Sequence, residues 1–507
     1  MEINIFASSD VHGFIDNYDY VKNENCSNSL AAINTAFKNS NSKNKIIVDN
    51  GDMIQGNFIG NFNENIPHPA IDVMNKIGYS IWNLGNHEFN YGVYNLKNVI
   101  KQFNNTTLMA NSNDDFFKKY KILNINGINI AFVGVNTPLI NKFESKEALG
   151  DLIITDPVIE LENILEDIKD KSDVIIGLFH MGLKNENSYL NSGALSIIDN
   201  LSNSNLLDVV ICGHTHQKIE EFFYKDILIT QPFVYGKNLS KIKLVFDNNK
   251  LISKSSSLID IESFEPDENI IEYYKTYHEK IIDFTHKTLG YIKNAEENRN
   301  VDLEDSPLAH FITDIMLSFS NADICSFQID NTKAYLSNGP LKRFHMSNLY
   351  SYSGGEVSTY KIKGFHLKKY MEWSASYFDK IDEKVVVNEK RSKLKYKTFD
   401  IFGNLLYEID LDEEIGNRVK NIKYTNGKEV KDDDSLIIAI NEYRMNFLMS
   451  EKGPLSGNEF EKLSTTKYQD EFGHKHGTIS GDLAEQFFEK LEDKTYIANN
   501  NKFFRII

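Results

Sequence analysis

Residues 46–52, Ile46-Ile47-Val48-Asp49-Asn50-Gly51-Asp52, join a short apolar run to a turn that carries two carboxylates. A run of Ile and Val that ends in polar residues and Gly is typical of a buried strand in a layered α/β fold. In open sheets of such folds, ligands bind at the carboxyl ends of the strands, where polar loops meet. This stretch therefore predicts both a buried sheet and a polar site at its edge.

The rest of the first half repeats this alternation of apolar runs and longer polar stretches. The segments between the runs, such as Ser29–Lys38 and Ile159–Ile168, have the apolar spacing of amphipathic helices. Strands that alternate with helices predict an α/β fold for this half. The other apolar runs are Ile3–Phe6, Ile128–Val135, Val174–Phe179 and Leu206–Cys212.

Five short polar motifs occur in order along this half, and four of them follow an apolar run. Their side chains offer oxygen and nitrogen donors but no sulfur, a set that Mg, Mn, Fe, Zn, Ni and Co all accept. A single His after a strand is more often a structural residue than a ligand, but the shared donor type and strand-end placement favour one metal cluster. The motifs are Asp10-Val11-His12, Asp49-Asn50-Gly51-Asp52, Gly85-Asn86-His87-Glu88, His180 and Gly213-His214-Thr215-His216.

In this order the motifs resemble the signature of the calcineurin-like metallophosphoesterases. The longer stretches Asp49–Gly56 and Gly85–Gly92, with Gln231-Pro232, are similar to the branch of 5′-nucleotidases and 2′,3′-cyclic-nucleotide 2′-phosphodiesterases. The resemblance implies an α/β protein with an N-terminal four-layer αββα metallophosphoesterase sandwich, a linker helix and a C-terminal α+β 5′-nucleotidase-type domain. It extends through the second half at Glu304–Leu308, Ala322–Ile324, Phe399–Gly403 and Asn441–Arg444.

A long amphipathic stretch separates the two halves of the chain. Residues 270–282 contain no Gly or Pro and predict a helix. Together with the resemblance, this helix places a metallophosphoesterase catalytic domain at residues 1–264, the linker helix at 265–288 and a 5′-nucleotidase C-terminal substrate-binding domain at 289–507.

The resemblance implies a role for each matching polar side chain. Asp52 would bridge two divalent metal ions, whose identity among Mn, Zn, Fe, Mg, Co and Ni stays open. A hydroxide between the ions would attack phosphorus in line. His87, which is not a ligand, would stabilise the phosphoryl group and protonate the leaving oxygen. One ion would be held by Asp10, His12 and His216, and the other by Asn86, His180 and His214.

Four further positions concern the substrate or the histidine at position 87. Many 5′-nucleotidases carry Asp three residues after the catalytic His, whereas this chain has Asn90, a mark of the cyclic-phosphodiesterase branch. Asn111 is expected either to contact a phosphate or a metal-bound water, or to cap a turn. Phe399 and Tyr443 match two aromatic residues that stack on the nucleobase in the resembling family. In a chain with 33 Phe and 25 Tyr, core packing is the equal alternative for each.

Two departures in the second half concern the substrate. Residues 326–340 contain no Arg, although the 5′-nucleotidase branch holds phosphate with an Arg there, and they end in the Gly339-Pro340 of the cyclic-phosphodiesterase pattern. The Gly-rich run that commonly follows the second aromatic residue is absent after Tyr443. The missing Arg leads us to expect a 2′,3′-cyclic-nucleotide 2′-phosphodiesterase and 3′-nucleotidase. The missing Gly-rich run predicts a reshaped base pocket and keeps a non-nucleotide substrate open.

Several other activities stay open at this point. The alternatives are a 5′-nucleotidase, a nucleotide-sugar or dinucleotide diphosphatase, and a phosphatase whose substrate is not a nucleotide. A binding protein that has lost catalysis is disfavoured, because every ligand that the resemblance implies is present.

The composition limits the partners and the setting. Of the 507 residues, 41% are hydrophobic, which excludes a disordered chain. The net charge of −17 argues against binding to long nucleic acids and to anionic membranes. The expected partner is a small nucleotide, and the oligomeric state stays open. No apolar run reaches the ~18 residues of a membrane span, and the first residues lack signal-peptide features. These features and the three well-separated cysteines predict a cytoplasmic protein if the N-terminus is unprocessed. They predict a secreted or surface protein if the N-terminus has been processed.

Overall fold

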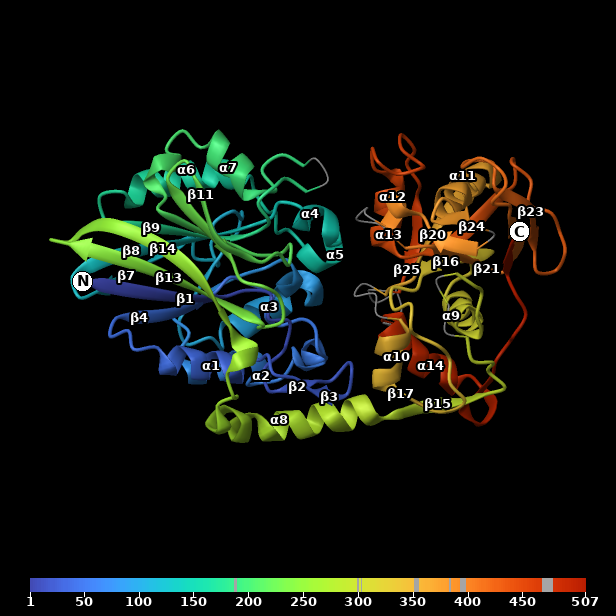
Figure 1. Cartoon of the computed structure of the whole chain (residues 1–507), viewed down its shortest axis with the longest axis horizontal. Helices are drawn as coiled ribbons and strands as arrows, with labels where there is room; N and C mark the ends of the chain where they lie inside the picture. Colours follow the sequence, from blue (N-terminus) through green and yellow to red (C-terminus); the bar gives the residue numbers. More distant parts are fainter. Residues whose placement is uncertain are drawn as a thin grey trace. The chain divides into compact units, whose positions relative to one another are not determined.

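The apolar run at residues 46–48 forms the centre of strand β4 (Lys45–Asp49), which pairs in parallel with β1 (Glu2–Ser8) and β5 (Ile81–Asn83). The chain divides into two compact units, Met1–Ile282 and Asp283–Ile507, and Figure 1 colours both along the sequence. The boundaries predicted at residues 264 and 288 stay a prediction. The computed structural model describes residues 1–186, 189–298, 301, 303–350, 355–382, 384–392, 398–466 and 477–507.

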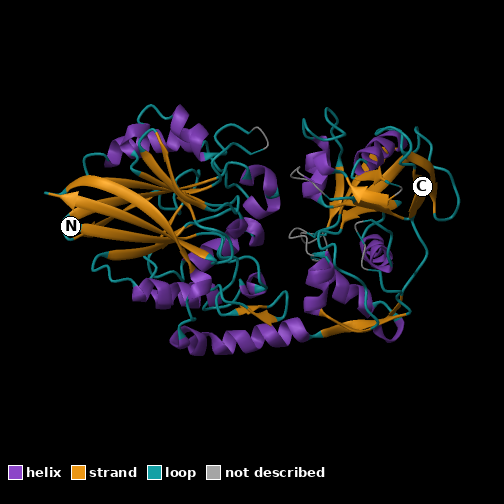
Figure 2. Cartoon of the chain, viewed as in Figure 1, coloured by secondary structure: helices purple, strands orange, loops and turns teal. Residues whose placement is uncertain are grey.

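The first unit contains two six-stranded sheets (Figure 2). The first has the order β14-β13-β1-β4-β5-β6 and the second the order β11-β12-β10-β9-β8-β7. The central strands run parallel in each sheet, β1 with β4 and β5, and β8 with β9 and β10, so that their carboxyl ends meet at one edge. The further strands are β6 (Thr106–Leu108), β7 (Tyr120–Ile125), β8 (Ile128–Asn136), β9 (Val174–His180), β10 (Val209–Cys212), β11 (Ile219–Tyr224), β12 (Ile227–Gln231), β13 (Asn238–Asp247) and β14 (Lys250–Asp260).

Alternating side chains of these strands separate the core into layers. Ile5 of β1 points between the two sheets, where it packs in one cluster with Ile176 of β9. Its neighbour Phe6 points to the opposite face and packs under three helices. Two more helices cover the outer face of the second sheet. The predicted four-layer αββα sandwich is confirmed, with α1 (Leu30–Asn39), α2 (Pro69–Ile77) and α3 (Val93–Ile100) on one side and α6 (Pro157–Ile168) and α7 (Ala194–Asn200) on the other.

Local capping explains where several of these elements begin. The Ser29 hydroxyl accepts a hydrogen bond from the Ala32 N–H at 3.1 Å and starts α1. Helix α6 begins before the predicted residue 159, because Asp156 caps it and Pro157 occupies its first position. The strand predicted from Leu206 is wrong in its first part. A 3₁₀ turn ends at Leu206, and β10 begins only at Val209.

Helix α2 begins with a buried histidine cap that makes the fold sensitive to acid. His68 is fully buried, its Nδ1 accepts the Ala70 N–H at 3.2 Å, and its Nε2 lies 2.6 Å from Asn63 Oδ1. Burial lowers the pKa of His68 from 6.5 to about 3. Between these two values the unfolded chain binds a proton that the folded chain excludes. Stability therefore falls as the pH falls through this window.

We expect the wild-type protein to lose about 2 kcal/mol more unfolding free energy than the His68→Asn variant between about pH 7 and about pH 5. Asn caps helices without titrating, so the variant keeps an acceptor for the Ala70 N–H. Denaturant unfolding of both proteins at the two pH values measures the difference. Equal losses in both proteins would contradict a buried neutral His68.

The second unit is built around a five-stranded sheet of order β21-β16-β24-β18-β25. Phe311 of α9 (Pro307–Ser318) and Leu367 of α11 (Gly364–Ala375) pack with Ile438 of the sheet in one core cluster. Two three-stranded sheets, β17-β15-β26 and β23-β22-β27, and a two-stranded sheet of β19 (Phe378–Ile381) and β20 (Lys384–Val387) complete this α+β unit. The strands are β15 (Thr288–Lys293), β16 (Ile324–Gln328), β17 (Gly339–Lys342), β18 (Ser358–Lys363), β21 (Asp400–Gly403), β22 (Leu405–Ile409), β23 (Val419–Tyr424), β24 (Ser435–Ile440), β25 (Lys462–Thr465), β26 (Thr495–Ile497) and β27 (Phe504–Ile506).

Helix α8 (Glu268–His286) covers the amphipathic stretch predicted at residues 270–282 and contains the point at which the chain divides. Its first part is attached to the first unit, since the hydroxyls of Tyr273 and Tyr277 donate to Asp72 at 2.9 and 3.0 Å. Among the helices of the described residues, none has both the length and the apolar character needed to cross a membrane.

Candidate metal centre

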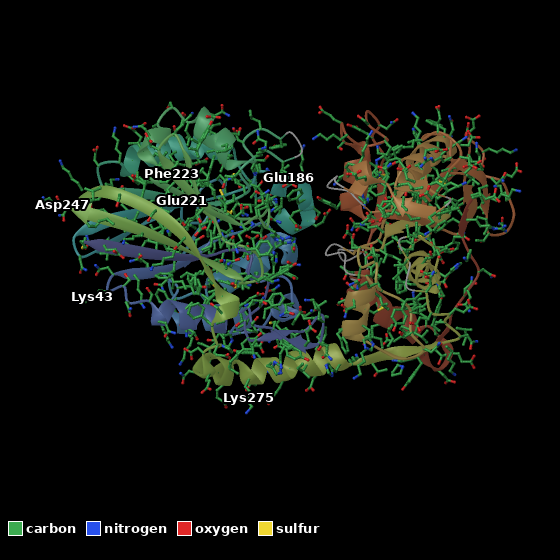
Figure 3. The ribbon with its side chains drawn as sticks, in the orientation of Figure 1. Lys43, Glu186, Glu221, Phe223, Asp247 and Lys275 are labelled. Atoms are coloured by element: carbon green, nitrogen blue, oxygen red, sulfur yellow. The ribbon has the colours of Figure 1, made fainter. Side chains whose placement is uncertain are left out.

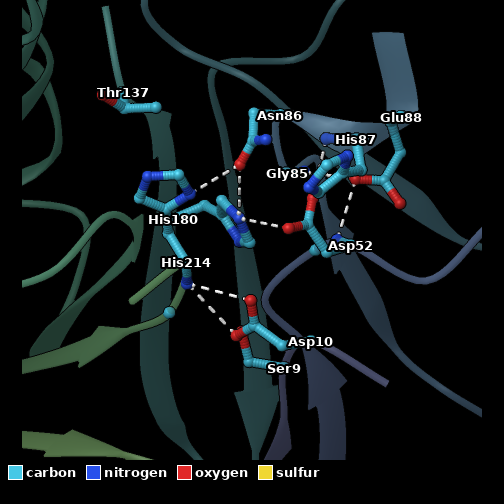
Figure 4. A network of polar contacts seen from close by, with 12 residues as sticks. Ser9, Asp10, Asp52, Gly85, Asn86, His87, Glu88, Thr137, His180 and His214 are labelled. Carbon is cyan, nitrogen blue, oxygen red and sulfur yellow. Dashed lines mark hydrogen bonds and ion pairs between the residues drawn. The ribbon is translucent and has the colours of Figure 1, made fainter. Parts of the chain in front are cut away.

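Polar side chains from all five motifs meet at the carboxyl-end edge of the two sheets (Figure 4). The loops after β1, β4 and β5 bring side chains from the first sheet, and β9 and the loop after β10 bring them from the second. Residues far apart in the sequence therefore come together because their strands end at the same edge. The side chains that meet are Asp10, His12, Asp52, Asn86, His180, His214 and His216.

Asp10, His12 and His216 form the first of two groups that could hold a metal ion. One ligand atom from each lies within 4.8 Å of the others. His12 Nε2 and His216 Nε2 are 3.1 Å apart, and His216 Nε2 lies 3.5 Å from Asp10 Oδ1. One carboxylate and two imidazoles that face a common point suit a divalent transition metal.

Asp52, His180 and His214 form the second group, again within 4.8 Å of one another. His180 Nε2 lies 3.1 Å from Asp52 Oδ2. The carboxamide oxygen of Asn86 lies 3.2 Å from His180 Nε2 and 2.7 Å from His214 Nδ1, so it faces the same point. Asp52 Oδ2 is also 4.0 Å from His12 Nε2 of the first group. Asp52 thus lies between the two groups, in the position that a bridging carboxylate needs.

The electrostatics of the two groups favour bound cations. Burial lowers the pKa of His12 to about 4, which keeps its imidazole neutral and able to act as a ligand. Burial also disfavours the charged form of His180, but the Asp52 carboxylate outweighs it and raises the pKa of His180 to about 10. The buried carboxylates therefore attract positive charge strongly, and the donor set fits two divalent ions.

The backbone is strained at these positions. Non-glycine residues in the left-handed region cost on the order of 1 kcal/mol each, and such strain clusters at functional sites. Close packing holds it in place, because a Cβ on Gly85 would lie only 2.2 Å from Asp52 Oδ1. The strained residues are Asp10 (φ 54°), His12 (φ 50°), Asp52 (φ 58°), His214 (φ 66°) and His216 (φ 50°).

Glu88 supports the turn that carries Asp52, a role that the sequence did not reveal. Its fully buried carboxylate accepts the N–H groups of Asp52, Met53 and Gly85 at 2.8, 2.7 and 2.6 Å. It therefore joins the loops after β4 and β5, which carry one ligand each. Its place directly after His87 in the third motif was the only signal of this role.

Three histidines of the site have a partner on the ring nitrogen that faces away from the two groups. His12 Nδ1 lies 2.9 Å from Gln55 Oε1, and His180 Nδ1 lies 2.6 Å from a backbone carbonyl. His214 Nε2 lies 2.8 Å from Glu186 Oε2, a residue labelled in Figure 3 on the loop after β9. Such partners fix the orientation and tautomer of a ligand histidine. Gln55 lies inside the motif stretch Asp49–Gly56 without a predicted role, and Glu186 belongs to no motif, so sequence reasoning missed both partners.

Glu186→Gln is expected to weaken the affinity for the metal ion at the second group about 10- to 100-fold. The variant keeps the size of the side chain but removes the carboxylate that accepts the His214 Nε2–H. Competition with a metal-chelating dye measures the affinity. Glu221→Gln, which removes an exposed carboxylate of strand β11, serves as the matched control. Equal affinities in the two variants would contradict the role of Glu186.

His87 lies beside the two ligand groups without joining either. Its backbone N–H donates to Asp52 Oδ1 at 2.8 Å, and its ring centroid is 5.5 Å from that of His12. Its Nδ1 lies 2.8 Å from Asn90 Oδ1. This placement, next to the ligands but outside them, suits the predicted contact with a phosphoryl group.

Asn111 lies in the interior of the first unit. It is fully buried, its Oδ1 accepts the Asn136 N–H at 2.8 Å, and its Nδ2 donates to the carbonyl oxygens of Asn136 and Thr155. Both ends of the carboxamide are used by the backbone, which favours the structural alternative for Asn111 over a phosphate contact.

The two predicted base-stacking residues lie in the second unit. The Phe399 side chain is only 6% exposed, and its ring packs against those of Phe378 and Phe504 at centroid distances of 4.6 and 5.2 Å. Tyr443 lies half-buried in the first turn of α13 (Glu442–Met449). The core contacts of Phe399 favour packing for this residue, and the stacking role of both residues stays a prediction.

Family models and known relatives match both halves of the chain. A family model described as calcineurin-like phosphoesterase matches residues 3–218, and one described as 5′-nucleotidase, C-terminal domain, matches residues 286–448. A 2′,3′-cyclic-nucleotide 2′-phosphodiesterase/3′-nucleotidase from Haemophilus influenzae is 24% identical over 88% of this chain and 80% of that protein. The trifunctional nucleotide phosphoesterase protein YfkN of Bacillus subtilis is 23% identical over 88% of this chain, which spans only 36% of that protein.

Among solved structures, a Staphylococcus aureus protein named as a 5′-nucleotidase is similar over the whole of both chains, with a TM-score of 0.81 and 21% identity. At this identity the likeness shows the fold alone. The two family models lie in the two structural units, and the resemblance inferred from the motifs is confirmed. This chain belongs to the calcineurin-like phosphoesterases that carry a 5′-nucleotidase C-terminal domain, a family of phosphoric ester hydrolases.

Proposed function

We propose that this protein is a dinuclear-metal phosphohydrolase that acts as a 2′,3′-cyclic-nucleotide 2′-phosphodiesterase and 3′-nucleotidase. Calcineurin-like phosphoesterases use a dinuclear metal centre. The observation that carries the proposal is the position of Asp52 between two groups of ligand atoms. Asp10, His12 and His216 would hold one ion, Asn86, His180 and His214 the other, and Asp52 both. When bound, two such ions lower the pKa of water and neutralise phosphoryl charge.

His87 acts on the leaving group in this proposal. Its Nδ1 faces the carboxamide oxygen of Asn90, which can only accept a hydrogen bond, so the Nδ1 carries a proton. When the ring is doubly protonated, Nε2 is then the atom that gives up its proton to the leaving oxygen, while Nδ1 keeps its own. The ring is left in the neutral tautomer that Asn90 stabilises.

The substrate assignment has two supports. Relatives from three bacteria carry the name 2′,3′-cyclic-nucleotide 2′-phosphodiesterase/3′-nucleotidase, and each matches 88% of this chain. Residues 326–340 also lack the Arg with which the 5′-nucleotidase branch holds phosphate. Further relatives that match 40% of this chain are named 5′-nucleotidases, so a 5′-nucleotidase is the second candidate.

A panel of 2′,3′-cyclic AMP, 3′-AMP, 5′-AMP and a UDP-sugar, each assayed with added Mn²⁺, tests the assignment. We expect kcat/KM for 2′,3′-cyclic AMP and 3′-AMP to exceed that for 5′-AMP by at least about tenfold, a difference of about 1.4 kcal/mol in transition-state binding. A preference for 5′-AMP would favour the second candidate. Hydrolysis of aryl phosphates without any nucleotide turnover would instead favour a phosphatase with another substrate.

A further inference from the structure

A chain of three side chains leads from the metal centre into the protein. His87 Nδ1 lies 2.8 Å from Asn90 Oδ1, and Asn90 Nδ2 donates to Glu144 Oε1 at 2.5 Å. His87 and Asn90 share the short 3₁₀ helix His87–Tyr91, whereas Glu144 follows helix α4 (Ile140–Phe143). A distant carboxylate is thereby connected to the ring beside the ligands.

The chemistry of these groups fixes the direction of each hydrogen bond. A carboxylate only accepts, so Glu144 holds the NH₂ end of the Asn90 carboxamide. The oxygen end must then face His87, and His87 Nδ1 must donate to it. If the carboxamide turned over, its NH₂ would face Nδ1. Nδ1 would then have to accept this hydrogen bond without a proton of its own. A ring that gives up a proton from Nε2 while Nδ1 is unprotonated would be left as an imidazolate, so this orientation disfavours proton donation to the leaving group.

The backbone of Glu144 completes helix α4 independently of its side chain. Its backbone N–H already ends α4 by donating to the Ile140 carbonyl at 2.9 Å, which needs no side chain. The side chain is nevertheless only 8% exposed and is directed at Asn90. Burying a carboxylate is costly unless it receives hydrogen bonds, so its contact with the carboxamide is a specific one.

We infer that Glu144 is a positioning residue for the reaction: it holds the Asn90 carboxamide in the one orientation that keeps the His87 proton on Nδ1. This inference rests on the proposed function and extends it. Many related enzymes carry Asp at the position of Asn90. In this chain the Asn90 side chain is neutral, and the carboxylate is supplied instead by Glu144, which contacts His87 through Asn90.

Glu144→Gln tests the inference, because a Gln can present either an acceptor or a donor to Asn90. We expect kcat for the best alkyl ester of the panel to fall about 10- to 100-fold, whereas kcat for p-nitrophenyl phosphate changes less than about threefold. The nitrophenolate leaves without help from an acid, and an alkoxide does not. A merely structural loss would lower both rates equally, and that result, or two unchanged rates, would overturn the inference.

A rescue variant and a matched control complete the experiment. Asn90→Asp in the Glu144→Gln background is expected to restore the alkyl-ester rate to within about threefold of wild type, since a carboxylate at position 90 accepts the Nδ1–H in either orientation. Glu147→Gln, an exposed carboxylate of the neighbouring helix α5 (Lys146–Leu149), is expected to leave both rates unchanged. A double variant as slow as the single one would contradict the inference.

The tautomer of His87 can be read without any turnover. In long-range ¹H–¹⁵N spectra of the metal-free full chain, with His87 assigned by comparison with His87→Gln, the wild-type ring is expected to be protonated on Nδ1 and the Glu144→Gln ring to be a mixture of tautomers. Identical tautomers in the two proteins would overturn the inference even if the protein hydrolyses none of the esters. If the wild-type protein hydrolysed none of the esters but both proteins showed the expected tautomers, the proposed function would be contradicted and the inference about Glu144 would stand.

Discussion

Replacing Asp52 by Asn is expected to lower kcat/KM for an aryl phosphate by on the order of 10³-fold or more, a loss of about 4 kcal/mol of transition-state stabilisation. Asp52 Oδ2 faces both ligand groups, at 3.1 Å from His180 Nε2 of the second group and 4.0 Å from His12 Nε2 of the first. A neutral carboxamide cannot join two cations, because its NH₂ end offers no lone pair. The change keeps the size of the side chain and an oxygen for the His87 N–H.

Metal analysis of the purified variant shows whether the ions are lost together with the activity. Asp72→Asn is the matched control, since Asp72 is a carboxylate of the same unit that accepts two tyrosine hydroxyls away from the site. It is expected to retain both the metals and the activity. Unchanged activity of Asp52→Asn would exclude the two-metal mechanism.

His87→Gln is expected to show the second largest effect, a loss of about 10²- to 10⁴-fold in kcat with both metals retained. His87 lies outside the two ligand groups, so its removal leaves the donor set complete. Its backbone N–H still donates to Asp52 Oδ1. The loss is expected to be greater for alkyl esters than for p-nitrophenyl phosphate, because only the former need a proton on the leaving oxygen.

Two measurements separate this role of His87 from a structural one. Steady-state kinetics with both classes of ester give the leaving-group dependence, and metal analysis gives the occupancy. Loss of one metal from His87→Gln would make the residue a ligand, contrary to the proposed assignment. An equal loss for both classes of ester would assign it to phosphoryl binding alone.

The elements of the fold that surround the centre could be predicted because their signals are local. A run such as Val174–Phe179 is apolar at every position, since both faces of a strand between two layers are buried. The last residue of strand β9, His180, is polar because the strand ends there at the site. The topology then brings such ends to one edge, so one cluster of the five motifs could be predicted from strand-end placement, whereas the resemblance was needed to pair Asp10 with His216.

The partners of the site residues could not be predicted in this way. Glu186 on His214, Gln55 on His12 and Glu144 on Asn90 lie in loops without periodicity, where neither spacing nor composition shows which side chains meet. Phe399 illustrates the opposite case. Its motif left a base contact and core packing as equal alternatives, and its contacts with Phe378 and Phe504 favour packing without testing the base contact.

The sequence by itself therefore determined the α/β alternation and the donor types at the strand ends, because these depend on local polarity patterns. The division of the ligands between two ions came from the resemblance to the metallophosphoesterases and stays a prediction. Only the tertiary structure decided where Asp52 lies relative to the two groups, which ring nitrogen of each histidine faces them, and which carboxylate holds Asn90. Those properties depend on distances of a few ångströms between loops, and they arise from packing of the whole unit rather than from any local pattern of residues.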